Sequence, residues 1–324
     1  MNPTFTLGRI AGVRIAINWT WAIVFGLIVW SLADSVFPDT NPGLSGAAYV
    51  TMALAAAALF FASLLLHELG HAVQARRDGL RVDHITLWLF GGVARLRGEF
   101  ASAGVEFRVA VAGPAVTVVL AGVFLALSLA APLPSGVDGV VAWLAYINVF
   151  LLAFNLLPAL PLDGGRVFRS ALWRAKRDFV WATRIAVGVS RALALALVGA
   201  GVVLLFVDDA MGGIWLSFIG LFLFQAASSE RRDLAVRGAL AGLRVGDLMR
   251  PYGPWSAWLQ APAYGMTLAS SDTALEALER LTARRAGGAL VVDSGNVVGV
   301  ISLGDLARVL MGAPAPGAPH AGYS

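Results

Sequence analysis

The 324-residue chain contains no cysteine, only four histidines and few charged residues. Without cysteine it can form neither a disulfide nor a thiolate metal site, so any metal ligands must be histidine or carboxylate groups. Charged residues make up 14% of the chain and hydrophobic residues 58%, and the mean hydropathy is +0.75. Ordinary soluble domains are far less apolar. The composition therefore indicates a membrane protein.

Six long stretches lack Asp, Glu, Lys and Arg. Each approaches the ~20 residues that cross a hydrocarbon core, except the fifth, which is short. We extend the fifth backward past Arg191 to about Ala182 and predict six transmembrane helices. A cleaved signal peptide is the alternative for the first stretch, which is Trp-rich and long for that purpose. The stretches are Ile15–Ala33, Thr40–Leu66, Val109–Val137, Gly139–Leu162, Ala192–Val207 and Ala210–Ser229.

The loops between these stretches differ in charge. Residues 34–45, 132–138 and 208–213 contain no Lys or Arg, whereas the alternate loops are rich in arginine. The positive-inside rule predicts that both termini and every basic loop are cytoplasmic. Such loops also explain the isoelectric point near 9.9, so we expect no nucleic-acid partner. The Ala- and Gly-rich, Cys-free composition favours the inner or plasma membrane of a prokaryote.

The expected fold is an α-helical polytopic membrane protein with about six transmembrane helices and a small α/β cytoplasmic domain. Helical periodicity at 273–284 and from 303 onward, with apolar runs at 289–292 and 297–301, predicts the α/β part. Alternating polar and apolar residues at 81–97 predict one or two short strands near the cytoplasmic face. The expected boundaries are 1–229 for the membrane domain, 230–243 for a charged linker, 244–311 for the α/β domain and 312–324 for a disordered tail.

The pentapeptide HELGH at 67–71 closes the second apolar stretch. On a helix, His67 and His71 are about 40° apart around the axis and about 6 Å apart along it, so both can reach one ion. Glu68 lies about 60° from His71 and can reach a water molecule at that ion. Ionisable groups at membrane depth are costly and are presumed functional. The pattern is typical of a zinc hydrolase.

The third ligand must come from elsewhere in the chain. His320 lies in the tail, and His84, in the predicted strand, is better explained as a surface or supporting residue. Asp163 is the better candidate because Pro158 and Pro161 break the fourth helix just before it. The alternative is that Asp163 caps a helix starting near residue 166. Because the second and fourth spans both run inward, Asp163 and the histidines reach the same membrane depth.

Several segments together resemble the site-2 protease family of intramembrane zinc metalloproteases. They are HELGH at 67–71, FGG at 90–92, AGP at 112–114 and NLLPALPLDGGR at 155–166. The resemblance implies one zinc ion held by His67, His71 and Asp163, with Glu68 as the catalytic base. It implies regulated proteolysis of a membrane-tethered protein within or near its transmembrane segment.

The same resemblance assigns two further roles and shows one departure. Asn155 is implied to hold the substrate or the tetrahedral oxyanion, and the strand region at Gly91 to pair with unwound substrate. Family members often carry Asn three residues after the AGP proline, where this chain has Thr117. We expect this departure to concern a packing detail and not the chemistry.

The C-terminal part resembles a CBS domain, which fits one branch of this family. In GVISLGDL at 299–306, Ser302 and Asp305 occupy positions where CBS domains hold an adenosine ribose, so ATP or AMP is implied as a ligand. Ser302 acting only as a helix cap is the alternative. One copy of the unit is evident, and because CBS units work in pairs, we expect a homodimer.

Two other classes of protein share some of these features. A transporter or channel with a CBS regulatory tail would also have six spans, but it would not need a His–Glu–His set and a carboxylate at one depth. Such proteins typically contain internal repeats, which we do not find. An inactive relative that binds membrane helices is disfavoured, because the expected metal ligands and catalytic base are all present. These residues are His67, Glu68, His71 and Asp163.

Overall fold

The computed structural model describes residues 5–88, 91–97, 100–130, 132–207, 210–251 and 266–311. The chain divides into two compact units, a first unit Met1–Glu230 and a second unit Arg231–Ser324. The tail predicted at 312–324 lies outside the described residues.

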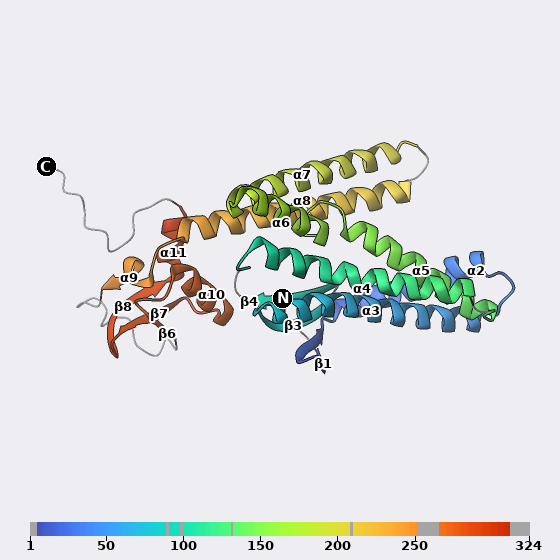
Figure 1. Ribbon diagram of the computed structural model, residues 1–324, viewed down its shortest axis with the longest axis horizontal. Coiled ribbons are helices and arrows are strands. Elements are labelled where there is room, and N and C mark those ends of the chain that lie inside the picture. The colour runs from blue at the N-terminus through green and yellow to red at the C-terminus, as the bar shows by residue number, and fades with distance from the viewer. Residues whose placement is uncertain are drawn as a thin grey trace. The chain divides into compact units, whose positions relative to one another are not determined.

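Among the described residues, six helical segments are long and apolar enough to cross a membrane (Figure 1). The predicted number of spans is therefore confirmed. The first segment, Thr20–Thr40, comprises α1 (Thr20–Ser31), the π-helix η1 (Leu32–Val36) and α2 (Phe37–Thr40). The other five are α3 (Gly46–Arg77), α4 (Ala103–Ala130), α5 (Ser135–Asn155), α7 (Phe179–Leu204) and α8 (Ala210–Leu240).

The prediction that the first span begins at Ile15 is wrong. Ile15 lies in β2 (Val13–Ile17), which pairs with β1 (Phe5–Ile10) as an antiparallel hairpin. Gly12, with φ of +75°, provides the left-handed backbone that the turn requires. A run without charges cannot distinguish a buried strand from the start of a helix, because both are apolar.

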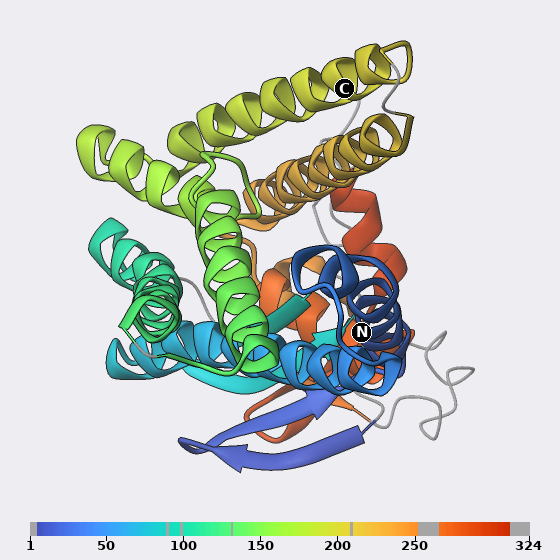
Figure 2. The same cartoon turned by 90° about the vertical axis from the view of Figure 1, so that its right-hand side faces the viewer.

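The hairpin belongs to a four-stranded sheet that packs against α3. β3 (Arg81–Trp88) pairs in parallel with β2 and antiparallel with β4 (Gly91–Arg97), so the order is β1-β2-β3-β4. The prediction of one or two strands at 81–97 is confirmed, since two are present. Figure 2 shows the hairpin running beside the α3 helix. One apolar cluster joins the sheet to the C-terminal half of α3; its buried members are Val13, Ile15, Leu69, Ala72 and Ile85.

Helix α3 is held closely against α4. At its start, Ser45 caps the helix by accepting a hydrogen bond from the backbone N–H of Ala48 at 3.2 Å. Further along, a Cβ atom on Gly70 would lie 2.8 Å from the carbonyl oxygen of Ala112 in α4. Small residues allow helix backbones in membranes to approach in this way. The close crossing brings side chains of α4 within reach of the HELGH segment.

Helix α5 ends at Asn155, and a turn at residues 156–162 leads into α6 (Asp163–Lys176). Pro158 and Pro161 fall in this turn, as the sequence predicts. The backbone N–H of Leu160 donates a hydrogen bond at 2.7 Å to Ser190 Oγ of α7, which anchors the turn. The turn therefore starts α6 at a fixed place in the first unit.

A buried ion-pair cluster joins α6 to two other helices. The guanidinium of Arg169 donates to Glu106 of α4, with Nε 2.9 Å from Oε1, and also to Glu230 of α8. Glu106 is fully buried and Arg169 is 5% exposed. Desolvated charges of this kind are stable only when paired. The cluster therefore fixes the position of α6 relative to α4 and α8.

The second unit is a small α/β fold with sheet order β5-β8-β7-β6. The predicted helices and strands are recovered with small shifts at their ends. The segment at 230–243, expected as a linker, is helical as far as Leu240 because α8 continues through it. The predicted elements correspond to α10 (Ala274–Arg284), β7 (Gly288–Asp293), β8 (Asn296–Ser302) and α11 (Leu303–Leu310). The structure adds α9 (Val245–Leu248), β5 (Arg250–Pro251) and β6 (Thr267–Ala269).

Candidate metal centre

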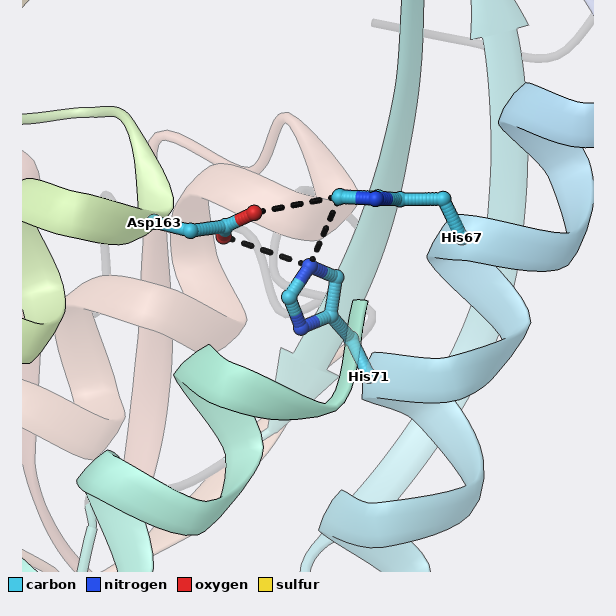
Figure 3. Close-up of side chains that lie close together, drawn as sticks. All are labelled: His67, His71 and Asp163. Atoms are coloured by element: carbon cyan, nitrogen blue, oxygen red, sulfur yellow. Dashed lines mark hydrogen bonds and ion pairs between the residues drawn. The ribbon is translucent and has the colours of Figure 1, made fainter. Parts of the chain in front are cut away.

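Helices α3 and α6 bring two imidazoles and a carboxylate together (Figure 3). His67 Nε2 lies 3.1 Å from Asp163 Oδ2, and His71 Nε2 lies 3.2 Å from Asp163 Oδ1. The two imidazole Nε2 atoms are 3.1 Å apart. All three residues are buried, at 3%, 5% and 7% exposure. These three residues are the ligands that the sequence predicts. The group found among the described residues does not include His84.

The outer ring nitrogens determine where each imidazole carries its proton. His71 Nδ1 lies 2.6 Å from the carbonyl oxygen of Val109, which can only accept a hydrogen bond. A neutral His71 must therefore be protonated at Nδ1 and present a lone pair at Nε2. His67 Nδ1 is 2.7 Å from the Thr117 hydroxyl. If that hydroxyl accepts a hydrogen bond, a neutral His67 is also protonated at Nδ1 and presents a lone pair at Nε2.

With both imidazoles in this tautomer, three electron-pair donors converge on one point with no proton between them. Such an arrangement is unfavourable by itself and is relieved by a cation. Two imidazoles with a carboxylate form a ligand set that catalytic zinc sites use, with a fourth position left for water or substrate. The donor chemistry of His67, His71 and Asp163 therefore fits a zinc ion.

Gly113 of α4 keeps this point accessible. A Cβ atom there would lie 2.7 Å from His67 Nε2 and closer still to His71 Nε2. Any side chain at residue 113 would enter the space that the two histidine Nε2 atoms face. Gly113 belongs to the AGP segment, for which the residues alone indicate no steric role.

The two predicted catalytic residues line the same cavity as the three donors. The cavity has a volume of about 360 Å³, and its lining includes Glu68 and Asn155. Glu68 lies against β4, since a Cβ atom on Gly92 would be 3.1 Å from Glu68 Cδ. Asn155 is the last residue of α5. The structure thus brings together all five residues that the sequence predicts for this centre.

Asp163 is not the helix cap that the alternative interpretation requires. The N-cap of α6 is Leu162, and Asp163 is the first helical residue. Gly164 and Gly165 follow it because any Cβ atom at either residue would clash with the backbone of the 156–160 turn. These glycines let the turn fold tightly under the helix and direct Asp163 toward α3.

Two features of the site are missed by sequence reasoning. The departure at Thr117 is not confined to packing, since its hydroxyl contacts His67. Arg166, the cation among the cavity-lining residues, lies one turn after Asp163 and stacks over the Phe100 ring at 5.1 Å. The i, i+3 spacing from Asp163 is the signal that could have indicated it.

In the second unit, Ser302 and Asp305 form a reciprocal cap at the start of α11. Ser302 Oγ accepts from the backbone N–H of Asp305 at 3.2 Å and donates to Asp305 Oδ2 at 2.7 Å. Asp305 Oδ1 accepts from Arg250 Nη2 at 2.7 Å and from Arg308 Nη2 at 3.2 Å. The capping role of Ser302 is therefore present, and both oxygens of Asp305 already have donors.

Known families match both units. The model of peptidase family M50 matches residues 55–134 and 130–198, and the CBS domain model matches residues 245–312. The protein named "Putative zinc metalloprotease Rip3" from Mycobacterium tuberculosis is 42% identical over 252 residues, 77% of this chain. The solved structure titled "Site-2 Protease from Methanocaldococcus jannaschii" is 30% identical and covers 70% of this chain and 94% of that one, with a TM-score of 0.47. The chain belongs to peptidase family M50.

This membership confirms the resemblance to the site-2 protease branch that carries CBS domains. Another relative of this M50 chain, zinc metalloprotease MJ0392 from M. jannaschii, is 29% identical over 94% of this chain and 80% of its own length. The chain spans 64% of the Rip3 protein. The protein is thus a multi-pass membrane member of a zinc metalloprotease family with a CBS domain.

Proposed function

We propose that the chain is an intramembrane zinc endopeptidase. It hydrolyses a peptide bond within or near the transmembrane segment of a membrane-tethered protein and so carries out regulated intramembrane proteolysis. The observation that carries this proposal is the convergence of His67, His71 and Asp163 beside Glu68 and Asn155 in one cavity. Membership in a metalloprotease family favours this function over a transporter or channel.

The five residues divide the chemistry between them. His67, His71 and Asp163 would hold the zinc ion, which when bound would supply the Lewis acidity that activates water and polarises the scissile carbonyl. Glu68 takes a proton from the attacking water and later delivers it to the leaving amine nitrogen. The side-chain amide of Asn155 donates a hydrogen bond to the oxygen on which negative charge develops.

The substrate must be extended at the cleaved bond, because a helical peptide bond is shielded and its carbonyl is already hydrogen-bonded. Strand β4 is the last strand in the sheet order, and Gly92 and Ala94 of β4 line the cavity next to Glu68. An unwound substrate segment that pairs with the edge of β4 on which no described strand lies would therefore pass the reactive groups. Strand addition supplies affinity through main-chain hydrogen bonds.

We further propose that both termini and the C-terminal end of α3 face the cytoplasm, as the arginine-rich loops indicate. HELGH lies in the last third of α3 and Asp163 follows the last residue of α5 by a short turn. The reactive centre would then lie near the cytoplasmic leaflet, and cleavage would release a soluble fragment inward. Membrane-tethered regulators and signal-peptide remnants are both compatible substrates.

Adenine nucleotide is proposed to modulate this activity through Ser302 and Asp305, with the CBS domain paired in a homodimer. The CBS family match supports this role. In the structure, the ribose hydroxyls would have to compete with Arg250 for Asp305. Calorimetric titration of the full-length protein with AMP and ATP tests the proposal, and absence of heat at millimolar nucleotide would reject it.

The decisive experiment for the enzyme compares the parental chain with Glu68→Gln. Membrane-protein fragments in cells are compared by proteomics, and zinc in each purified full-length protein is measured by elemental analysis. We expect about one zinc per chain in both proteins and loss of the fragments only in the variant. Glu279→Gln, on the exposed face of α10, is the matched control and should behave like the parental chain.

Parental fragment levels in Glu68→Gln cells would show that Glu68 is not the base. A parental protein that retains no zinc would reject the metal centre itself. Because the two readouts are separate, either failure can be recognised.

A further inference from the structure

Thr117 is a buried residue of α4 whose hydroxyl touches one of the two histidines. Its Oγ1 lies 2.7 Å from His67 Nδ1 and 3.4 Å from the carbonyl oxygen of Gly113, one turn earlier on the same helix. The side chain is fully buried. Within this pocket, the hydroxyl can exchange hydrogen bonds only with groups that the fold holds close to it.

The partners of the hydroxyl determine the direction of each hydrogen bond. The Gly113 carbonyl can only accept, so it offers the single hydroxyl proton of Thr117 a partner on the side away from His67. The oxygen lone pairs are then left to accept a proton from His67 Nδ1. In this arrangement His67 carries its proton on Nδ1 and directs the Nε2 lone pair toward Asp163, 3.1 Å away.

The two histidines therefore reach the same tautomer by different means. His71 is oriented by the backbone carbonyl of Val109, which no substitution removes. His67 is oriented by a side chain, and this partner can be changed without altering the backbone. A hydrogen-bond acceptor behind a histidine ligand fixes its ring and raises its basicity, and its loss typically lowers metal affinity 10–100-fold.

We propose that Thr117 is a positioning residue for the metal centre. It acts through His67, by fixing the tautomer and the ring orientation in which Nε2 can bind zinc. This inference rests on the proposed zinc site and adds to it a supporting residue on a third helix, α4. The hydroxyl is the essential group, and the methyl group of Thr117 serves only to fill space.

The test measures the zinc affinity of full-length protein in detergent by competition with a chromophoric chelator. Thr117→Val has nearly the same shape but no hydroxyl, and we expect its zinc affinity to fall about 10–100-fold. Thr117→Ser keeps the hydroxyl and should stay within about threefold of the parental protein. Thr183→Val is the matched control, because Thr183 is also buried and also donates to a carbonyl one turn back, that of Phe179 at 2.8 Å.

The three variants separate a role of the hydroxyl from a role in packing. If Thr117→Val binds zinc as tightly as the parental protein, the inference is wrong. If Thr117→Ser loses as much affinity as Thr117→Val, or if Thr183→Val loses as much, volume or general destabilisation is responsible and the inference is again rejected. A parental protein that binds no zinc would reject the site as a whole, and this result is distinct because no affinity could be compared.

Discussion

Asp163 and Asp305 are buried carboxylates in the first turn of a helix, one in each unit, and their neighbours differ in one respect. Asp305 in α11 is met by groups that bring protons, namely Ser302, Arg250 and Arg308. Asp163 in α6 is met by two imidazole Nε2 atoms, and the other nitrogen of each ring lies against the Thr117 hydroxyl or the Val109 carbonyl. A position at a helix N-terminus favours a carboxylate in both cases.

The difference shows which buried acid needs a ligand. The negative charge of Asp305 is balanced by Arg250 and Arg308, and both of its carboxylate oxygens accept hydrogen bonds. This cluster therefore stabilises the second unit without any added group. The cluster around Asp163 gathers only electron-pair donors and becomes favourable when a cation is added. Burial alone does not distinguish the two, since Asp305 is less exposed than Asp163, at 1% against 7%.

The largest effect is expected from filling the space in which the Asp163 cluster would hold the metal ion. Gly113→Ala places a methyl group against both Nε2 atoms, so zinc affinity should fall at least about 100-fold, the upper end for a disturbed ligand shell. Gly122→Ala lies on the same helix where a Cβ atom meets nothing within 4 Å, and its zinc affinity should match the parental value. Chelator competition measures both, and a fully zinc-competent Gly113→Ala would place the ion elsewhere.

A smaller effect is expected from breaking the buried ion-pair cluster of Arg169, Glu106 and Glu230. Arg169→Met removes the positive charge between Glu106 and Glu230 and leaves Glu106 buried without a partner. The free energy of unfolding should fall by about 3–5 kcal/mol, as for other broken buried pairs. Denaturant titration in detergent micelles gives this value. Arg174→Met, on an exposed part of the same helix, should change it little, and equal losses in both variants would contradict the assignment.

The smallest effect is expected in the second unit. Asp305→Ala removes the reciprocal cap of α11 and the pairing with Arg250, and should cost about 1–2 kcal/mol of stability. Zinc content should be unchanged, because the cluster around Asp305 has no part in metal binding. Asp293→Ala, at the exposed last residue of β7, serves as the control. Loss of zinc from Asp305→Ala would show that the contrast between the clusters is false.

Much of the centre could be predicted because it depends on short-range patterns. Helix periodicity places His67 and His71 on one face of the helix. The prolines before Asp163 predict that the preceding helix ends there, so that the carboxylate can point inward. Alternation at 81–97 was sufficient to predict strand structure there, although it left open whether one strand or two would form. The number of spans follows from composition, since charge-free runs of this length have few alternatives.

The remainder depends on contacts between distant segments. The partners of the imidazole Nδ1 atoms, Val109 and Thr117, are determined by the angle and depth at which α4 crosses α3, which no local pattern records. The pairing of Arg169 with Glu106 and Glu230 likewise requires three helices to meet. The β1–β2 hairpin was missed because Ile15 belongs to an uncharged run that continues into a helix, so two elements appear as one.

Helix α8 has a practical consequence for anyone who cuts this protein in two. The core of the second unit contains Leu240, with Val236 packed against it, and both belong to α8. A fragment that begins at residue 245, where the CBS match starts, would expose the apolar surface that these side chains cover. A C-terminal fragment intended to fold independently should therefore begin near residue 231 and keep the last turns of that helix.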